Sequence, residues 1–145
     1  MKTNLTFALL IAGMLNSPMA HASAKTQMAL NCYETENKQA VFSVKLPKDL
    51  KTQTSGDVKA QLGNGQKLSG VFESHVNTGM TRISGMTSVE IEANYPLPDY
   101  SKPHTLQVSI IGQNNPKPSY FGTAQLLGLT GNAIAEYFVD CKLGQ

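Results

Sequence analysis

The side chains best suited to catalysis are those of Glu73, Ser74 and His75, which follow one another in the sequence. A hydrolase with a serine nucleophile needs a histidine as general base and a group that orients this histidine. If the segment is a strand, Glu73 and His75 share one face and Ser74 points to the other. The serine is therefore poorly placed for this histidine, and an exposed polar strand end explains the pattern equally well.

Glu90 and Glu92 form a second candidate pair, because alternate residues of a strand lie on one face. Their spacing of roughly 6.8 Å is near the separation of the two carboxylates in inverting glycosidases. Any solvated strand face would show the same pattern, however. A hydrolase of unrecognised type, using Glu73, His75 or the pair Glu90 and Glu92, thus stays open as an alternative.

Other motifs that carry chemistry are missing from the sequence. It contains no G-x-S-x-G, no phosphate-binding or dinucleotide-binding glycine motif and no H-E-x-x-H. The acidic residues do not cluster at the spacing of a calcium loop. The 12 lysines and arginines, set against 10 acidic residues, form no basic stripe. We therefore expect no cofactor, no metal and no nucleic-acid partner, and the sequence favours a protein that is not an enzyme.

The two cysteines, Cys32 and Cys141, lie near the two ends of the predicted mature chain. A redox pair usually has the spacing C-x-x-C, which is absent. A metal site would need further ligands, and His75 and His104 are the only histidines left after export. The sequence therefore predicts a single Cys32–Cys141 disulfide that joins the first strand to the last.

The first residues of the chain have the pattern of a secretory signal peptide. Lys2 precedes an apolar stretch over residues 5–15, and small residues follow Pro18. Cleavage after Ala22 or Ala24 fits, and the second is preferred, which makes residues 1–24 the signal peptide. The apolar stretch is shorter than the ~20 residues of a membrane span. We expect an exported protein, periplasmic or extracellular, with no membrane span after cleavage.

Residues 25–145 are predicted to form a single all-β domain. Apolar and polar residues alternate, most clearly where Val89, Ile91 and Ala93 alternate with Glu90 and Glu92. No segment of ten or more residues has the period of a helix. The expected strands are 26–33, 39–46, 56–62, 66–74, 80–95 (broken near Gly85), 105–112, 120–128 and 133–142. This spacing predicts an antiparallel β-sandwich or a small β-barrel, with about seven or eight strands.

Two loops flank the strand expected over residues 105–111, and each contains a tyrosine expected to be exposed, Tyr100 or Tyr120. We favour the loop 112–120 as the contact surface, because its polar and aromatic residues suit recognition and its prolines restrict it. The predicted binding residues are Asn114, Asn115, Lys117 and Tyr120.

These patterns together predict a non-catalytic exported domain that binds a protein, a peptide or a glycan through its loops. A second class of function stays open beside the hydrolase. In this alternative the protein is a structural envelope or assembly module that pairs with its partner by strand addition, which requires an exposed edge strand.

Overall fold

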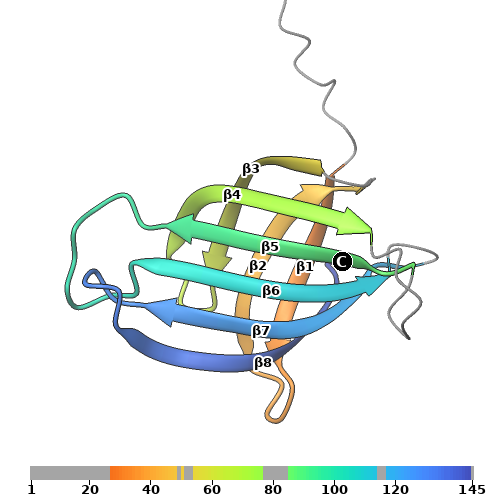
Figure 1. Ribbon diagram of the computed structural model, residues 1–145. Helices are drawn as coiled ribbons and strands as arrows, with labels where there is room; N and C mark the ends of the chain where they lie inside the picture. The colour runs from red at the N-terminus through yellow and green to blue at the C-terminus, as the bar shows by residue number, and fades with distance from the viewer. Residues whose placement is uncertain (1–26, 49, 51–53, 77–84, 114–116, 145) are drawn as a thin grey trace, which may run out of the picture.

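The computed structural model describes residues 27–48, 50, 54–76, 85–113 and 117–144. The predicted signal peptide, its cleavage sites, Asn114 and Asn115 lie outside these residues. The described residues form eight strands (Figure 1). They are β1 (Gln27–Glu34), β2 (Ala40–Pro47), β3 (Thr54–Leu62), β4 (Lys67–Val76), β5 (Thr87–Asn94), β6 (Thr105–Gln113), β7 (Ser119–Leu127) and β8 (Ala133–Leu143).

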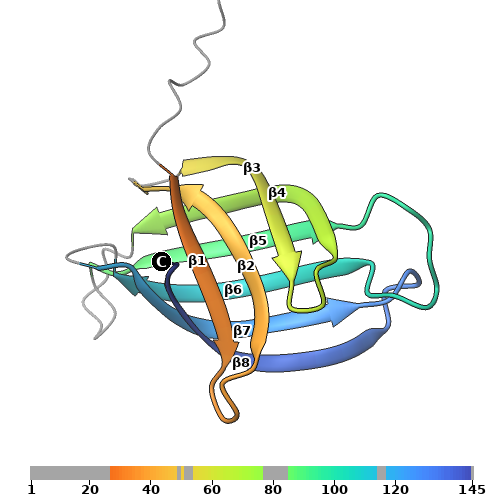
Figure 2. The ribbon, with the colours of Figure 1, turned by 180° about the vertical axis from the view of Figure 1, so that it is seen from behind.

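The strands form one closed antiparallel barrel. Each strand pairs with the next one along the chain, and β8 returns to pair with β1, as the views from the front and from behind show (Figures 1 and 2). The prediction of an all-β antiparallel fold is confirmed, and of the two architectures the structure has the barrel. The strand expected over 80–95 is shorter in the described residues, where β5 begins at Thr87. Gly85 has a φ of 82°, which a strand residue does not adopt.

Alternation along each strand separates the core from the outer surface. Val89, Ile91 and Ala93 are buried inside the barrel, and Glu90 and Glu92 are exposed on its outside, as the sequence predicted. An eight-stranded barrel has an interior that side chains can fill completely. The largest fully buried side chains include Tyr120, Leu30, Leu46, Leu68, Leu106 and Ile110.

Two glycines allow the backbones of neighbouring strands to approach one another closely. Gly70 in β4 and Gly122 in β7 occupy inward positions, between buried residues of the same strands. A Cβ atom at Gly70 would lie 1.9 Å from the backbone oxygen of Glu92, and one at Gly122 would lie 2.0 Å from that of Ser109. Glycine at such corners is how a sheet closes into a barrel.

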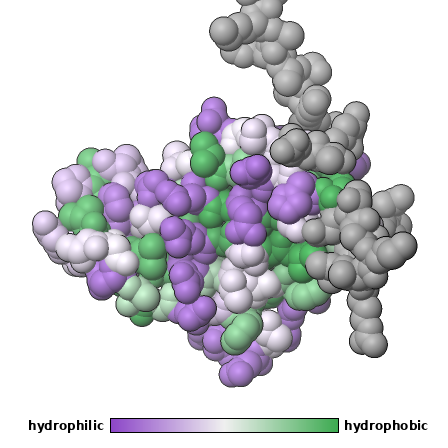
Figure 3. Space-filling view, in the orientation of Figure 1, coloured by the Kyte–Doolittle hydropathy of each residue, from purple (hydrophilic) through white to green (hydrophobic). Residues whose placement is uncertain are grey.

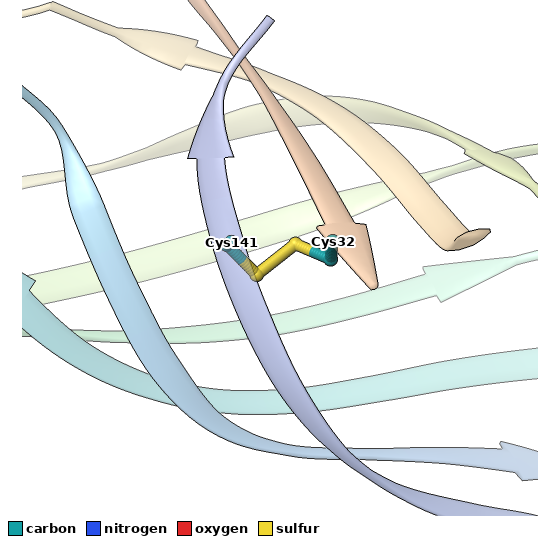
Figure 4. The surroundings of a disulfide bond; sticks show 2 residues. All are labelled: Cys32 and Cys141. Atoms are coloured by element: carbon teal, nitrogen blue, oxygen red, sulfur yellow. A yellow bond between two sulfur atoms is a disulfide. The ribbon is translucent and has the colours of Figure 1, made fainter. Parts of the chain in front are cut away.

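The disulfide joins the two strands that close the barrel. Cys32 of β1 and Cys141 of β8 are direct cross-strand partners, both completely buried, and their sulfur atoms are bonded at 2.01 Å (Figure 4). The predicted disulfide is thereby confirmed. Because the two residues are 109 positions apart in sequence, the bond encloses nearly the whole domain.

The pairing between strands is least extensive between β2 and β3. It covers the four residue pairs from Phe42–Leu62 to Lys45–Lys59, whereas β3 and β4 pair over eight. The first residues of β3, 54–57, therefore pair with β4 on one side and lie beyond the β2 register on the other. In the described part of the chain, no helix is long and apolar enough to cross a membrane.

Candidate functional site

Tyr120, the aromatic residue chosen for the contact loop, points into the barrel. Its side chain is 1% exposed, and its cross-strand partners are Gly112 of β6 and Cys141 of β8. The expectation of an exposed Tyr120 was wrong, because β7 begins at Ser119 and the alternation then places the next residue inside. Burial raises the pKa of Tyr120 to about 12.

Lys117 is the one predicted binding residue that the structure describes as exposed. The proposal that residues 112–120 form the contact surface thus loses its aromatic member. A polar loop without an exposed aromatic side chain offers little buried area to a partner.

The residues considered for hydrolysis lie on the open outer face of the barrel. Glu73 of β4 and Glu90 of β5 are direct cross-strand partners, and His75 is opposite Ser88 further along the same strands. Ser74 points to the other face, as predicted, where it is buried and donates a hydrogen bond to the backbone oxygen of Thr54 at 3.2 Å. The structure therefore does not bring this serine and His75 together.

The outer carboxylates border a shallow groove of about 660 Å³ that crosses β3 to β7. The Ser109 hydroxyl donates a hydrogen bond to Glu90 at 2.7 Å, and the Gln107 amide donates to Glu92 at 3.4 Å. Within the described residues, no group of three or more His, Cys, Asp or Glu side chains is arranged to hold a metal ion. The exposed carboxylates give this groove a negative charge, so it can attract positively charged groups.

The loop between β5 and β6, residues 95–104, presents the most exposed aromatic side chain among the described residues. Tyr100 is 82% exposed and Leu97 is 59% exposed. The loop projects beyond the end of the barrel (Figure 1), and hydrophobic residues stand among hydrophilic ones on this projecting end (Figure 3). The expectation that Tyr100 is exposed is confirmed. We call residues 95–104 the β5–β6 loop.

The tip of the β5–β6 loop is held by Asp99. Its carboxylate accepts hydrogen bonds from the Ser101 hydroxyl at 2.6 Å and the Ser101 amide at 2.9 Å. These two bonds, together with the Lys102 ammonium 3.5 Å away, lower the pKa of Asp99. The same ammonium lies 5.6 Å from the centre of the Tyr95 ring. The polar contacts therefore fix the backbone on both sides of Tyr100.

The base of the β5–β6 loop is tied to two other elements. The Tyr95 amide donates to the His104 oxygen at 2.7 Å, and the His104 amide donates to the Leu127 oxygen of β7 at 2.7 Å. The Gln66 side chain, from the turn between β3 and β4, donates to the Pro103 oxygen at 2.6 Å. These bonds hold the loop in a defined position on the barrel, and three prolines restrict its backbone. The prolines are Pro96, Pro98 and Pro103.

The sequence predicts an exposed Tyr100 but favours residues 112–120 as the contact surface. The signal that distinguishes the two is the segment Asp99-Tyr100-Ser101, because an aspartate bonded to the backbone amide two residues later forms an Asx turn.

Comparison of the chain with models of protein families, with curated proteins and with solved structures found no match.

Proposed function

We propose that the protein is a binding module that inserts its β5–β6 loop into a cleft of a protein partner, with Tyr100 and Leu97 as the apolar anchors. The observation that carries this proposal is the 82% exposure of Tyr100 on a loop held by hydrogen bonds on both sides of it. A tyrosine offers a large contact area and loses little conformational freedom on binding. A loop already held in one shape avoids much of the ordering cost of association.

The pairing of an aliphatic with an aromatic side chain favours a protein partner over a glycan. Leu97 is 59% exposed, and an apolar pocket would bury it together with Tyr100. A glycan could stack the C–H face of a sugar ring on Tyr100, but its hydroxyl-rich surface would bury the aliphatic Leu97 less completely than an apolar protein pocket. Proteins are therefore the partner class that makes use of both side chains.

The loop proposed here and the loop predicted from sequence lie at opposite ends of β6 (Thr105–Gln113). They cannot form one compact site, because a strand of that length separates its ends by more than about 20 Å. The β5–β6 loop is therefore proposed in place of residues 112–120, and the two do not form one surface. Export remains part of the proposal, supported by the buried Cys32–Cys141 disulfide, since such bonds persist in oxidising compartments.

Strand addition remains the alternative, and the short pairing between β2 and β3 is the observation that favours it. A partner strand would have to enter beside residues 55–57 of β3, where the β2 register has ended. A peptide captured in this way would protect backbone amides of β3 from hydrogen exchange. A partner bound by the β5–β6 loop would instead protect the loop.

The experiment that tests the proposal isolates a partner from the source organism's envelope extract and measures its dissociation constant. We expect Tyr100→Ala to weaken binding about 30-fold or more, as a hot-spot residue does. Leu97→Ala should also weaken binding. Phe138→Ala is the matched control, because Phe138 is 71% exposed on β8, away from the loop. If the loop variants bind as tightly as the wild type, the proposal fails.

A further inference from the structure

The outer surface of the barrel carries two grooves of opposite charge. Among the described residues, the first, of about 530 Å³, is lined by Lys45, Lys59 and Lys67 and by no carboxylate. The second, of about 660 Å³, is the one described above, and no lysine or arginine of the described part of the chain lines it. Its acidic residues are Asp57, Glu73, Glu90 and Glu92. We call them the lysine groove and the carboxylate groove.

Each groove contains two like charges placed directly opposite one another. Lys45 of β2 is the cross-strand partner of Lys59 of β3, and Glu73 of β4 is the partner of Glu90 of β5. Like charges in direct opposition destabilise a sheet. The ion pairs Lys38–Asp140 and Lys102–Asp99 lie outside both grooves. Asp57 lies two residues before Lys59 on the outer face of β3 and lines a third groove with Lys45 and Lys59, so it offsets part of this cost for the lysine pair. The Glu73–Glu90 pair keeps its cost, which an oppositely charged surface would relieve.

The third charge of the lysine groove is set diagonally to this pair. Lys59 is opposite Ser69 of β4, and Lys67 lies two residues before Ser69 on that strand. Lys45 and Lys59 therefore lie side by side on β2 and β3. Lys67 lies on β4, displaced from them by two residues along the strand.

The carboxylate groove repeats this arrangement in the reverse strand order. Glu73 is opposite Ser55 of β3, and Asp57 lies two residues after Ser55. Glu90 and Glu73 therefore lie side by side on β5 and β4. Asp57 lies on β3, displaced from them by two residues toward the same end of the barrel as Lys67. The two sets of three charges are therefore mirror images. Two surfaces that meet face to face match when their patterns are mirror images.

We propose that the lysine groove of one copy docks on the carboxylate groove of a second copy of this chain. The matched pairs are Lys45 with Glu90, Lys59 with Glu73, and Lys67 with Asp57. A second copy is the occupant that fits both grooves, because each carries the pattern that the other lacks. The contact joins two different surfaces, so further copies can add to form a ring or a chain.

The association is weak and depends on salt, because solvent-exposed ion pairs contribute little and are screened by ions. Sedimentation equilibrium of the disulfide-intact protein tests it over a range of concentrations. In about 0.01 M salt, where screening acts over roughly 30 Å, the average mass should rise with protein concentration. In about 1 M salt, where screening acts over roughly 3 Å, the protein should be monomeric.

Charge reversal identifies the surfaces. Lys59→Glu and Glu73→Lys should each weaken self-association about tenfold, since each places like charges against one another. An equimolar mixture of the two variants should recover it, because each reversed groove then matches the other. Lys117→Glu and Glu36→Lys are the controls, as they make the same changes of net charge at exposed positions outside both grooves.

Circular dichroism and thermal unfolding establish that each variant is folded, and Lys59→Gln with Glu73→Gln replace any reversal that is not. A monomer at every concentration in low salt overturns the proposal. So does equal weakening by the control variants, or a mixture that associates no better than its components. Tyr100→Ala should leave self-association unchanged, which separates this surface from the β5–β6 loop.

Discussion

Replacing both Cys32 and Cys141 by alanine should lower the free energy of unfolding by about 2–5 kcal/mol. The two residues are 109 positions apart, so the bond restricts the unfolded chain across nearly the whole domain. Chain-entropy arithmetic for a loop of about 100 residues gives roughly 4.7 kcal/mol. This is an upper figure, because denatured chains retain structure. The β1–β8 backbone pairing, which spans Leu30–Leu143 to Glu34–Val139, does not need the disulfide and should persist in the folded variant.

The measurement is urea-induced unfolding of the oxidised wild type and of the double alanine variant, followed by circular dichroism. Cys32→Ala alone and Cys141→Ala alone serve as controls, because each breaks the same bond and retains one thiol. All three variants should lose similar amounts of stability. A loss below about 1 kcal/mol in the double variant would contradict the view that the disulfide secures the closure of the barrel.

Three further predictions follow from the alternation, the barrel corners and the loop. Ile91→Ala should cost about 2–5 kcal/mol and Glu90→Ala no more than about 0.5 kcal/mol, and equal costs in urea unfolding would contradict the register. Gly122→Ala should cost about 1–3 kcal/mol by the same measurement, because its Cβ would lie 2.0 Å from a backbone oxygen of β6. The pKa of Asp99 is lower in the folded protein than in the unfolded chain, where it is about 3.9. The Asp99 carboxylate therefore stabilises the loop fully above pH ~3.9, and this stabilisation is lost as the pH falls through the lower pKa of the folded protein. The amide resonance of Ser101 should titrate over that lower range, and Asp99→Asn should abolish the titration.

The sequence by itself determined the strands and their inward faces. Burial of one face imposes a period of two, so Val89, Ile91 and Ala93 could be placed inside from their alternation with glutamates. The disulfide was also predictable, because a chain with only two cysteines allows a single intramolecular pairing. The exposure of Tyr100 followed from its position between prolines.

The tertiary structure alone decided how the strands are arranged and which surfaces they form. Sandwich and barrel share the same alternation, so only the pairing of β8 with β1 distinguishes them. Tyr120 lies inside because it belongs to β7 rather than to the preceding loop, and it shares the inward face of that strand with Ala124 and Leu126. The β5–β6 loop depends on Gln66 and Leu127, which are distant in sequence. Lys45 and Lys59 likewise become neighbours only through the register of β2 and β3, and no local pattern encodes that register.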